Sequence, residues 1–165
     1  ATYYTIPYFD IGVKIVCDPT KLESDNIIEV CGSVHYLKPG YSLMSRKVFD
    51  MEKVRAAGLL RTDPVAFERE LADGYVQGVQ VYKSAVISLN MTLASLGINE
   101  LLARLHPFRE ETNDYYDHIE VSLSSMDMFK EQYPLKCPII GMDIGKGDQI
   151  PLLEMPELSE RVEYE

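Results

Sequence analysis

The segment between Ser84 and His106 constrains the fold most, because apolar residues follow it on two stripes at once. One stripe recurs at alternating steps of four and three residues, and the other lies beside it at positions 86, 89, 93 and 96; both spacings predict a helix. The first stripe consists of Ile87, Met91, Ala94, Ile98, Leu101 and Leu105. A helix that is apolar on two sides must be covered on both, so we expect a sheet on one side and another helix or a second subunit on the other.

The remaining elements follow from local patterns. Apolar and polar residues alternate from Phe9 to Ile15 and again from Ile28 to Tyr36, which predicts an antiparallel hairpin that ends at Pro39 and Gly40. Helices are predicted from Asp50 to about Leu60, and from Asp63 and Pro64 to about Gly78. A third strand is predicted at 119–124, after a polar loop at 109–118. The pattern therefore predicts an α/β domain.

Composition excludes several classes of function. The 165 residues fit one domain, and 16 basic against 26 acidic residues give a net charge of -10. This charge argues against contact with a nucleic-acid backbone and favours a basic or amphipathic partner. Polar residues within the long helix argue against a membrane span. Three cysteines match no disulfide framework, which favours reduced thiols in a cytoplasm.

No motif identifies an active site. The glycine-rich run Gly141 to Gly147 fails as a phosphate loop because Ile140 stands where its first glycine belongs and Gly147 replaces the Ser or Thr that holds magnesium; we interpret it as a turn. Cys31, Ser33 and His35 share the polar side of the second strand, but residues two apart are separated by about 6 to 7 Å, too far for direct hydrogen bonding. The histidines show no metal-ligand spacing. No catalytic residue is identifiable from spacing.

Several phrases carry a resemblance to a known family. They read Ile-Pro-Tyr-Phe-Asp-Ile-Gly at 6–12, Lys-Pro-Gly-Tyr-Ser-Leu-Met-Ser-Arg at 38–46, Ala-Val-Ile-Ser-Leu-Asn-Met at 85–91, Ala-Ser-Leu-Gly-Ile-Asn-Glu-Leu-Leu-Ala-Arg-Leu-His-Pro-Phe-Arg at 94–109, and Gly-Lys-Gly-Asp-Gln-Ile-Pro-Leu-Leu-Glu-Met-Pro-Glu-Leu at 145–158. Together they resemble the carboxyl-terminal half of ThiF/MoeB/HesA-family adenylyltransferases, the prokaryotic relatives of ubiquitin-activating enzymes. The resemblance covers nearly the whole chain.

The resemblance implies a fold and a function. In that family an amino-terminal Rossmann-like half binds ATP and magnesium, and the enzyme adenylates the carboxyl-terminal glycine of a ubiquitin-like or sulfur-carrier protein. Residues 1–130 would then be the carboxyl-terminal part of a Rossmann-like ThiF domain, with the hairpin 8–37 beside the channel for the partner's tail and a crossover region at about 47–83. Residues 131–165, which contain four prolines, would form an extended arm. The family usually dimerises, so a homodimer is expected.

The resemblance also implies what this chain lacks. The Gly-rich loop and the magnesium Asp of the family are not among these residues, so ATP and Mg would be bound outside the chain, and the chain alone is expected to be inactive. The first residue is Ala rather than Met, which we interpret as truncation of a longer protein. Asp10, Gly12, Lys14 and Arg46 are the residues expected nearest the tail channel.

Two departures from the family bear on chemistry. Many relatives hold zinc with two CxxC pairs, but here Ser42 and Ser45 (or Gly40 and Leu43, one register over) replace the first pair, and the second retains only Cys137 with Ile140. We therefore expect no zinc. No cysteine lies between Cys31 and Cys137, so a thioester within this half is not expected.

Two alternatives stay open. The chain could be a non-catalytic, adenylyltransferase-like module kept for dimerisation or for holding a partner, and the coding sequence before Ala1 would distinguish that from the enzyme. The chain could also be an unrelated α/β domain whose phrases match by chance.

Overall fold

The computed structural model describes residues 1–18, 27–73 and 87–148, which fall into two compact units. Residues 1–41 and 85–165 belong to the first unit, and residues 42–84 to the second. None of the described helices is both long enough and apolar enough to cross a membrane.

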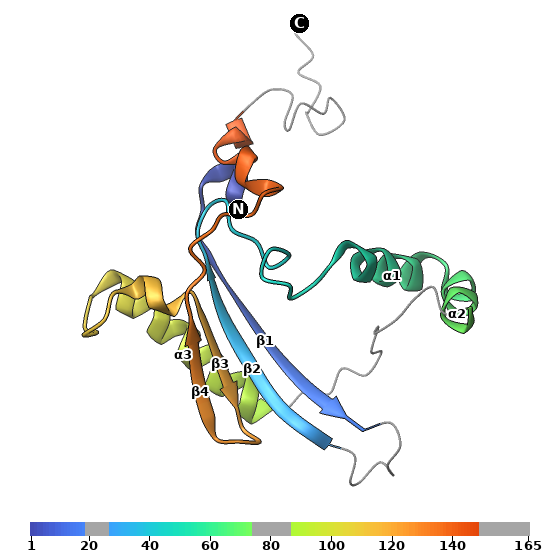
Figure 1. The fold of residues 1–165 in the computed structure, drawn as a ribbon, viewed down its shortest axis with the longest axis horizontal. Helices are drawn as coiled ribbons and strands as arrows, with labels where there is room; N and C mark the ends of the chain where they lie inside the picture. Colours follow the sequence, from blue (N-terminus) through green and yellow to red (C-terminus); the bar gives the residue numbers. More distant parts are fainter. Residues whose placement is uncertain (19–26, 74–86, 149–165) are drawn as a thin grey trace, which may run out of the picture. The chain divides into compact units, whose positions relative to one another are not determined.

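The first unit is built on a four-stranded sheet in the order β1-β2-β3-β4 (Figure 1). Its strands are β1 (Tyr8–Cys17), β2 (Ile27–Leu37), β3 (His118–Ser122) and β4 (Asp127–Glu131), and every neighbouring pair is antiparallel. The predicted hairpin and third strand are confirmed, whereas β4 was not predicted. The expectation of a Rossmann-like sheet is corrected to a coarser result: the described part of the chain is a mixed α/β structure with an antiparallel sheet and three helices, and it shows no parallel sheet.

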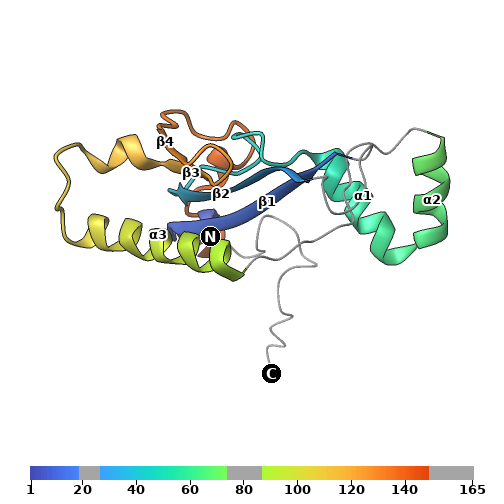
Figure 2. The ribbon, with the colours of Figure 1, turned by 90° about the horizontal axis from the view of Figure 1, so that it is seen from below.

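Helix α3 (Ile87–Leu105) lies along one face of the sheet (Figure 2). Leu89 and Leu93 are fully buried and form the core with Val34 and Val121. These leucines belong to the second predicted stripe, so its burial against a sheet is confirmed. Most of the first stripe is exposed, with the exposed fraction of Ile98 at 58%. The second cover that the sequence predicts for α3 therefore stays a prediction.

Two glycines allow this close packing. A Cβ added at Gly32 on β2 would lie 2.0 Å from Cδ1 of Leu93, and a Cβ added at Gly97 on α3 would lie 2.5 Å from Cδ1 of Ile11. Both distances are far below van der Waals contact, so helix and sheet approach closely only because these positions carry no side chain.

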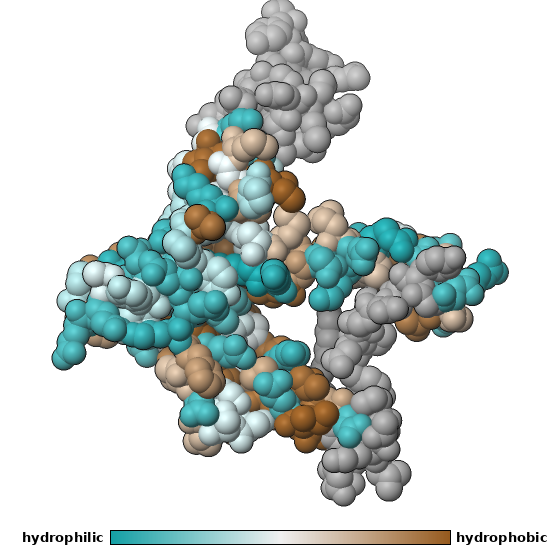
Figure 3. Space-filling view, in the orientation of Figure 1, coloured by the Kyte–Doolittle hydropathy of each residue, from teal (hydrophilic) through white to brown (hydrophobic). Residues whose placement is uncertain are grey.

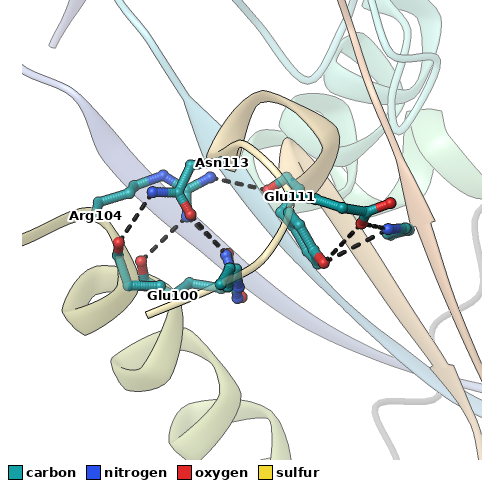
Figure 4. A network of polar contacts seen from close by, with 8 residues as sticks. Glu100, Arg104, Glu111 and Asn113 are labelled. Atoms are coloured by element: carbon teal, nitrogen blue, oxygen red, sulfur yellow. Dashed lines mark hydrogen bonds and ion pairs between the residues drawn. The ribbon is translucent and has the colours of Figure 1, made fainter. Parts of the chain in front are cut away.

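A buried ion cluster ties the end of α3 to the following loop (Figure 4). The Glu100 carboxylate is 2% exposed and accepts hydrogen bonds from Arg104 at 2.7 Å and from Arg109. Arg104 also donates to the Tyr116 carbonyl at 2.9 Å, and Asn113 donates to the Ala103 carbonyl at 2.9 Å. The predicted loop thus contains a short 3-10 helix, η2 (Asn113–Tyr116), held by charge-assisted bonds.

The second unit contains two capped helices, α1 (Met51–Thr62) and α2 (Pro64–Ala72). Asp50 and Asp63 accept hydrogen bonds from the backbone amides of Lys53 and Ala66, so the predicted caps are confirmed. Phe67 on α2 is buried in the cluster that joins the two helices. The predicted continuation of the second helix towards Gly78 lies outside the described residues.

The described part of the expected arm contains two 3-10 helices, η3 (Ile140–Asp143) and η4 (Lys146–Asp148), which contact η1 (Thr2–Tyr4) near the start of the chain. Gly147 packs there so closely that an added Cβ would lie 2.5 Å from Cδ1 of Tyr4. The glycine-rich run therefore forms turns, as we interpreted it. Residues 149–165 of the expected arm lie outside the described residues.

Candidate functional site

The candidate site is the face of the sheet opposite α3, which we call the polar face. Strand residues alternate between faces, and residues directly opposite each other on neighbouring strands share a face. The α3 side is fixed by Gly32 and Val34, which pack against that helix, so the residues in between point to the other side. The polar face includes Asp10, Gly12, Lys14, Glu29, Cys31, Ser33, His35, His118, Glu120, Ser122, Asp127, Phe129 and Glu131. At its ends the same alternation adds the apolar residues Tyr8, Val16 and the buried Leu37. Figure 3 shows the sheet unit from this side, with the hydrophilic surface densest over the segment that follows α3 and a mixture of hydrophilic and hydrophobic surface over the strands.

The first cross-strand row contains two histidines between two carboxylates. Asp10 lies opposite His35, His35 opposite His118, and His118 opposite Glu131. The imidazole rings stack with centroids 4.1 Å apart and planes 8° apart, and Nδ1 of His118 lies 3.4 Å from the Glu131 carboxylate. The Tyr133 hydroxyl donates to the same carboxylate at 2.8 Å. Burial raises the pKa of Asp10 because it disfavours the charged form.

The middle row contains a glycine that packing does not require. Gly12 lies opposite Ser33, which lies opposite Glu120, and Phe129 completes the row. A Cβ added at Gly12 would meet only Oγ of Ser33, at 4.0 Å. Unlike Gly32, this position has room for a side chain, and its glycine leaves a low point on the face. A glycine of this kind in a strand is typical of a place where another backbone approaches.

The third row surrounds a buried thiol. Cys31 lies between Lys14 and Ser122 and is 5% exposed. Its Sγ and the carboxylate oxygens of Glu29 and Glu120 all lie within 4.8 Å of one another, so these three side chains could offer ligands to a metal ion. Burial raises the pKa of Cys31, and the two glutamates raise it further. The protonated thiol is a poor nucleophile and a poor ligand.

The structure groups three of the four predicted channel residues. Asp10, Gly12 and Lys14 share the polar face with Cys31, Ser33 and His35, the cluster that the sequence analysis set aside as too widely spaced. Arg46 belongs to the second unit, where its side chain is buried.

Ser42, Ser45 and Cys137, which stand where many members of the resembled family carry zinc-binding cysteines, make contacts of their own. The backbone amide of Ser45 donates to Oγ of Ser42 at 3.1 Å, and Ser45 Oγ donates to the Ser42 carbonyl at 2.8 Å. The thiol of Cys137 is buried, and its backbone amide donates to the Gly40 carbonyl at 2.8 Å. The serines thus close a turn on themselves.

Sequence reasoning missed the contribution of the third and fourth strands. The alternation at 119–124 places Glu120 and Ser122 on a polar side, but it does not show which strand they pair with. The pairing of β3 with β2 brings Glu120 beside Ser33 and Cys31, and His118 onto His35.

Comparison with known proteins leaves the site to be interpreted from its own chemistry, since no family model, no curated protein and no solved structure matches the chain. The polar face combines a low point at Gly12, a protonated buried thiol and several half-buried carboxylates. These groups suit the binding of an extended chain better than the making or breaking of a bond.

Proposed function

We propose that the chain is part of an ATP-dependent adenylyltransferase of the ThiF type that activates the carboxyl terminus of a ubiquitin-like or sulfur-carrier protein. The proposed activity is that of the adenylyltransferase family which the phrases at 6–12, 38–46, 85–91, 94–109 and 145–158 resemble. In this proposal the polar face is the floor of the channel for the partner's tail, and ATP and Mg are bound by residues outside this chain. The observation that carries the proposal is Gly12, a glycine that leaves space on the face where packing demands none.

The exposed edge of the sheet supports the idea that the sheet continues in a larger domain. Strand β1 is ten residues long and pairs with β2 on one side only in the described sheet. Its residues Ile11 and Val13 are 44% and 36% exposed. A long edge strand with an exposed apolar face invites pairing with another chain, and proteins normally cover it. A Rossmann-like half that continued the sheet at β1 would cover this edge.

The exposed stripe of α3 supports the homodimer. The stripe follows the alternating steps of a helix seam, and Ile87, Met91, Ile98 and Leu105 are each more than half exposed. A narrow stripe with this repeat is typical of packing against another helix. The same helix of a second copy carries the identical repeat, so we propose that it is the partner.

Substitution at Gly12 in the full-length enzyme tests the proposed function. Gly12→Arg would place a long side chain over Ser33 and obstruct the channel, so ATP–pyrophosphate exchange that depends on the partner protein should fall by about 100-fold or more. Gly12→Ala is the graded comparison: a methyl group fits there without a clash and fills much less of the space, so exchange should fall far less than in Gly12→Arg. Normal exchange by Gly12→Arg would exclude Gly12 from the channel. Absence of exchange in the unsubstituted protein would favour the non-catalytic module.

A further inference from the structure

We infer that Asp117 is a positioning residue for the first cross-strand row of the polar face. It acts through Tyr133, whose backbone amide it binds and whose hydroxyl holds Glu131. This inference rests on the proposed function, because the first row lies beside Gly12 on the floor of the proposed channel. It goes further by giving a role to a buried carboxylate that the sequence analysis did not single out.

Asp117 is a charged residue placed inside the protein. Its side chain is 1% exposed, and its Oδ1 lies 3.5 Å from Nζ of Lys38, the residue that follows β2. A buried ion pair adds little net stability, because the loss of hydration offsets much of the attraction between the charges. A buried carboxylate therefore needs another justification, and the contacts of its other oxygens supply one.

The other hydrogen bonds of Asp117 join three segments at one end of the sheet. Asp117 directly precedes β3, and its backbone carbonyl accepts a hydrogen bond from the Tyr36 amide of β2 at 2.8 Å. Oδ2 of its carboxylate accepts from the Tyr133 amide at 3.2 Å, two residues after β4 ends. The chain that leaves β4 is thus held against the start of β3 by a charge-assisted hydrogen bond.

Tyr133 carries this anchoring onto the polar face. Its hydroxyl donates to the Glu131 carboxylate at 2.8 Å, and the same carboxylate lies 3.4 Å from Nδ1 of His118, whose ring stacks on that of His35. The Glu131 side chain is 59% exposed, so without the hydroxyl it would occupy several rotamers. Asp117 therefore reduces the freedom of the first row without lying on the polar face itself.

Ordered side chains in the first row favour the binding of an extended chain. Residues two apart on a strand, such as Asp10 and Gly12, are separated by about 6 to 7 Å, so a backbone that passes over Gly12 reaches the first row with its neighbouring residues. Groups that are already ordered lose less conformational entropy when such a chain binds. Loss of the Asp117 carboxylate should therefore weaken binding of the tail and leave ATP binding, which the proposed function places outside this chain, unchanged.

Equilibrium binding of a tail peptide to the full-length protein tests the inference without ATP. The probe is fluorescein-labelled Ala-Ala-Ala-Ala-Gly-Gly with a free carboxyl terminus, and binding is read by fluorescence anisotropy. Asp117→Ala should weaken binding about tenfold, whereas Asp117→Asn, which keeps an acceptor oxygen for the Tyr133 amide, should stay within about twofold of the unsubstituted protein. Tyr133→Phe should weaken binding about threefold, and adding it to Asp117→Ala should cause little further loss, because both changes act through the same contacts.

Leu93→Ala is the matched control for stability, because it weakens the same unit from the opposite side of the sheet. It should leave peptide binding within about twofold, at a temperature at which circular dichroism shows the variant to be folded. If Asp117→Ala does not fold, Tyr133→Phe decides the question: a loss of binding supports the inference, and normal binding overturns it.

The remaining outcomes separate this inference from the proposed function. Normal binding by Asp117→Ala, failure of Asp117→Asn to preserve binding, an equal loss in Leu93→Ala, or no binding of the peptide by the unsubstituted protein would each overturn the inference. The expected pattern of binding without any exchange activity would reject the proposed activity alone. Blocked exchange in Gly12→Arg together with normal binding by Asp117→Ala would reject the role of Asp117 alone.

Discussion

The contact between Gly32 and α3 gives the sharpest prediction about stability. Substitution of Gly32 by Ala places a methyl group 2.0 Å from Cδ1 and 3.1 Å from Cγ of Leu93, and 3.0 Å from the backbone oxygen of Gly12. Leu93 is fully buried, and protein interiors are close-packed, so its side chain has little room to move. Relief of the clash therefore requires α3 to shift away from the sheet or Leu93 to leave its preferred rotamer.

The expected magnitude follows from the cost of overpacking a well-filled core. Gly32→Ala should lower the free energy of unfolding by about 1 to 3 kcal/mol. Leu93→Ala alone should lower it by about 2 to 5 kcal/mol, because it leaves a cavity. In the double variant the new methyl group occupies part of that cavity. The double variant should therefore lose less than the sum of the two single losses, by about 1 kcal/mol or more.

Urea denaturation followed by circular dichroism measures all three values. Gly12→Ala is the matched control, because it makes the same change on the neighbouring strand, where the nearest atom is 4.0 Å away. This control should be neutral or should stabilise by up to about 1 kcal/mol, since Ala restricts the unfolded chain more than Gly. The reasoning fails if Gly32→Ala is as stable as the unsubstituted chain, or if the losses in the double variant simply add.

Three further predictions concern the ion cluster, the thiols and the exposed stripe. Glu100→Gln should lower the free energy of unfolding by about 3 to 5 kcal/mol in the same denaturation assay, because two half-buried arginines lose the charge of their buried carboxylate partner. A change within error would refute the role of the cluster. In iodoacetamide labelling read by mass spectrometry, the half-buried Cys17 should react before the buried Cys31. Cys31 should still react slowly at pH 8, because its raised pKa keeps the thiol protonated until higher pH. Labelling of Cys31 before Cys17 would contradict this prediction. Ile98→Glu should shift the chain from dimer to monomer in sedimentation velocity. Thr92→Glu, at an exposed polar position of the same helix, should leave the dimer intact. A monomer in every case, the unsubstituted chain included, would exclude the exposed stripe of α3 as a dimer contact.

Much of the fold could be predicted because its signals are local. Alternation identified β1 and β2 to within about one or two residues of their observed ends, and the aspartates and Pro64 marked where α1 and α2 begin. Strand β4 escaped prediction because all five of its residues are exposed, so burial imposes no alternation on its sequence.

The sequence by itself determined which residues face away from α3, since a strand's period of two separates Asp10, Gly12 and Lys14 from their apolar neighbours. Only the tertiary structure decided which polar residues meet. The register between β2 and β3, strands far apart along the chain, stacks His118 on His35 and brings Glu120 to Glu29 and Cys31. No periodicity within either strand encodes that register, because it is set by the packing of both strands against Leu89 and Leu93 of α3.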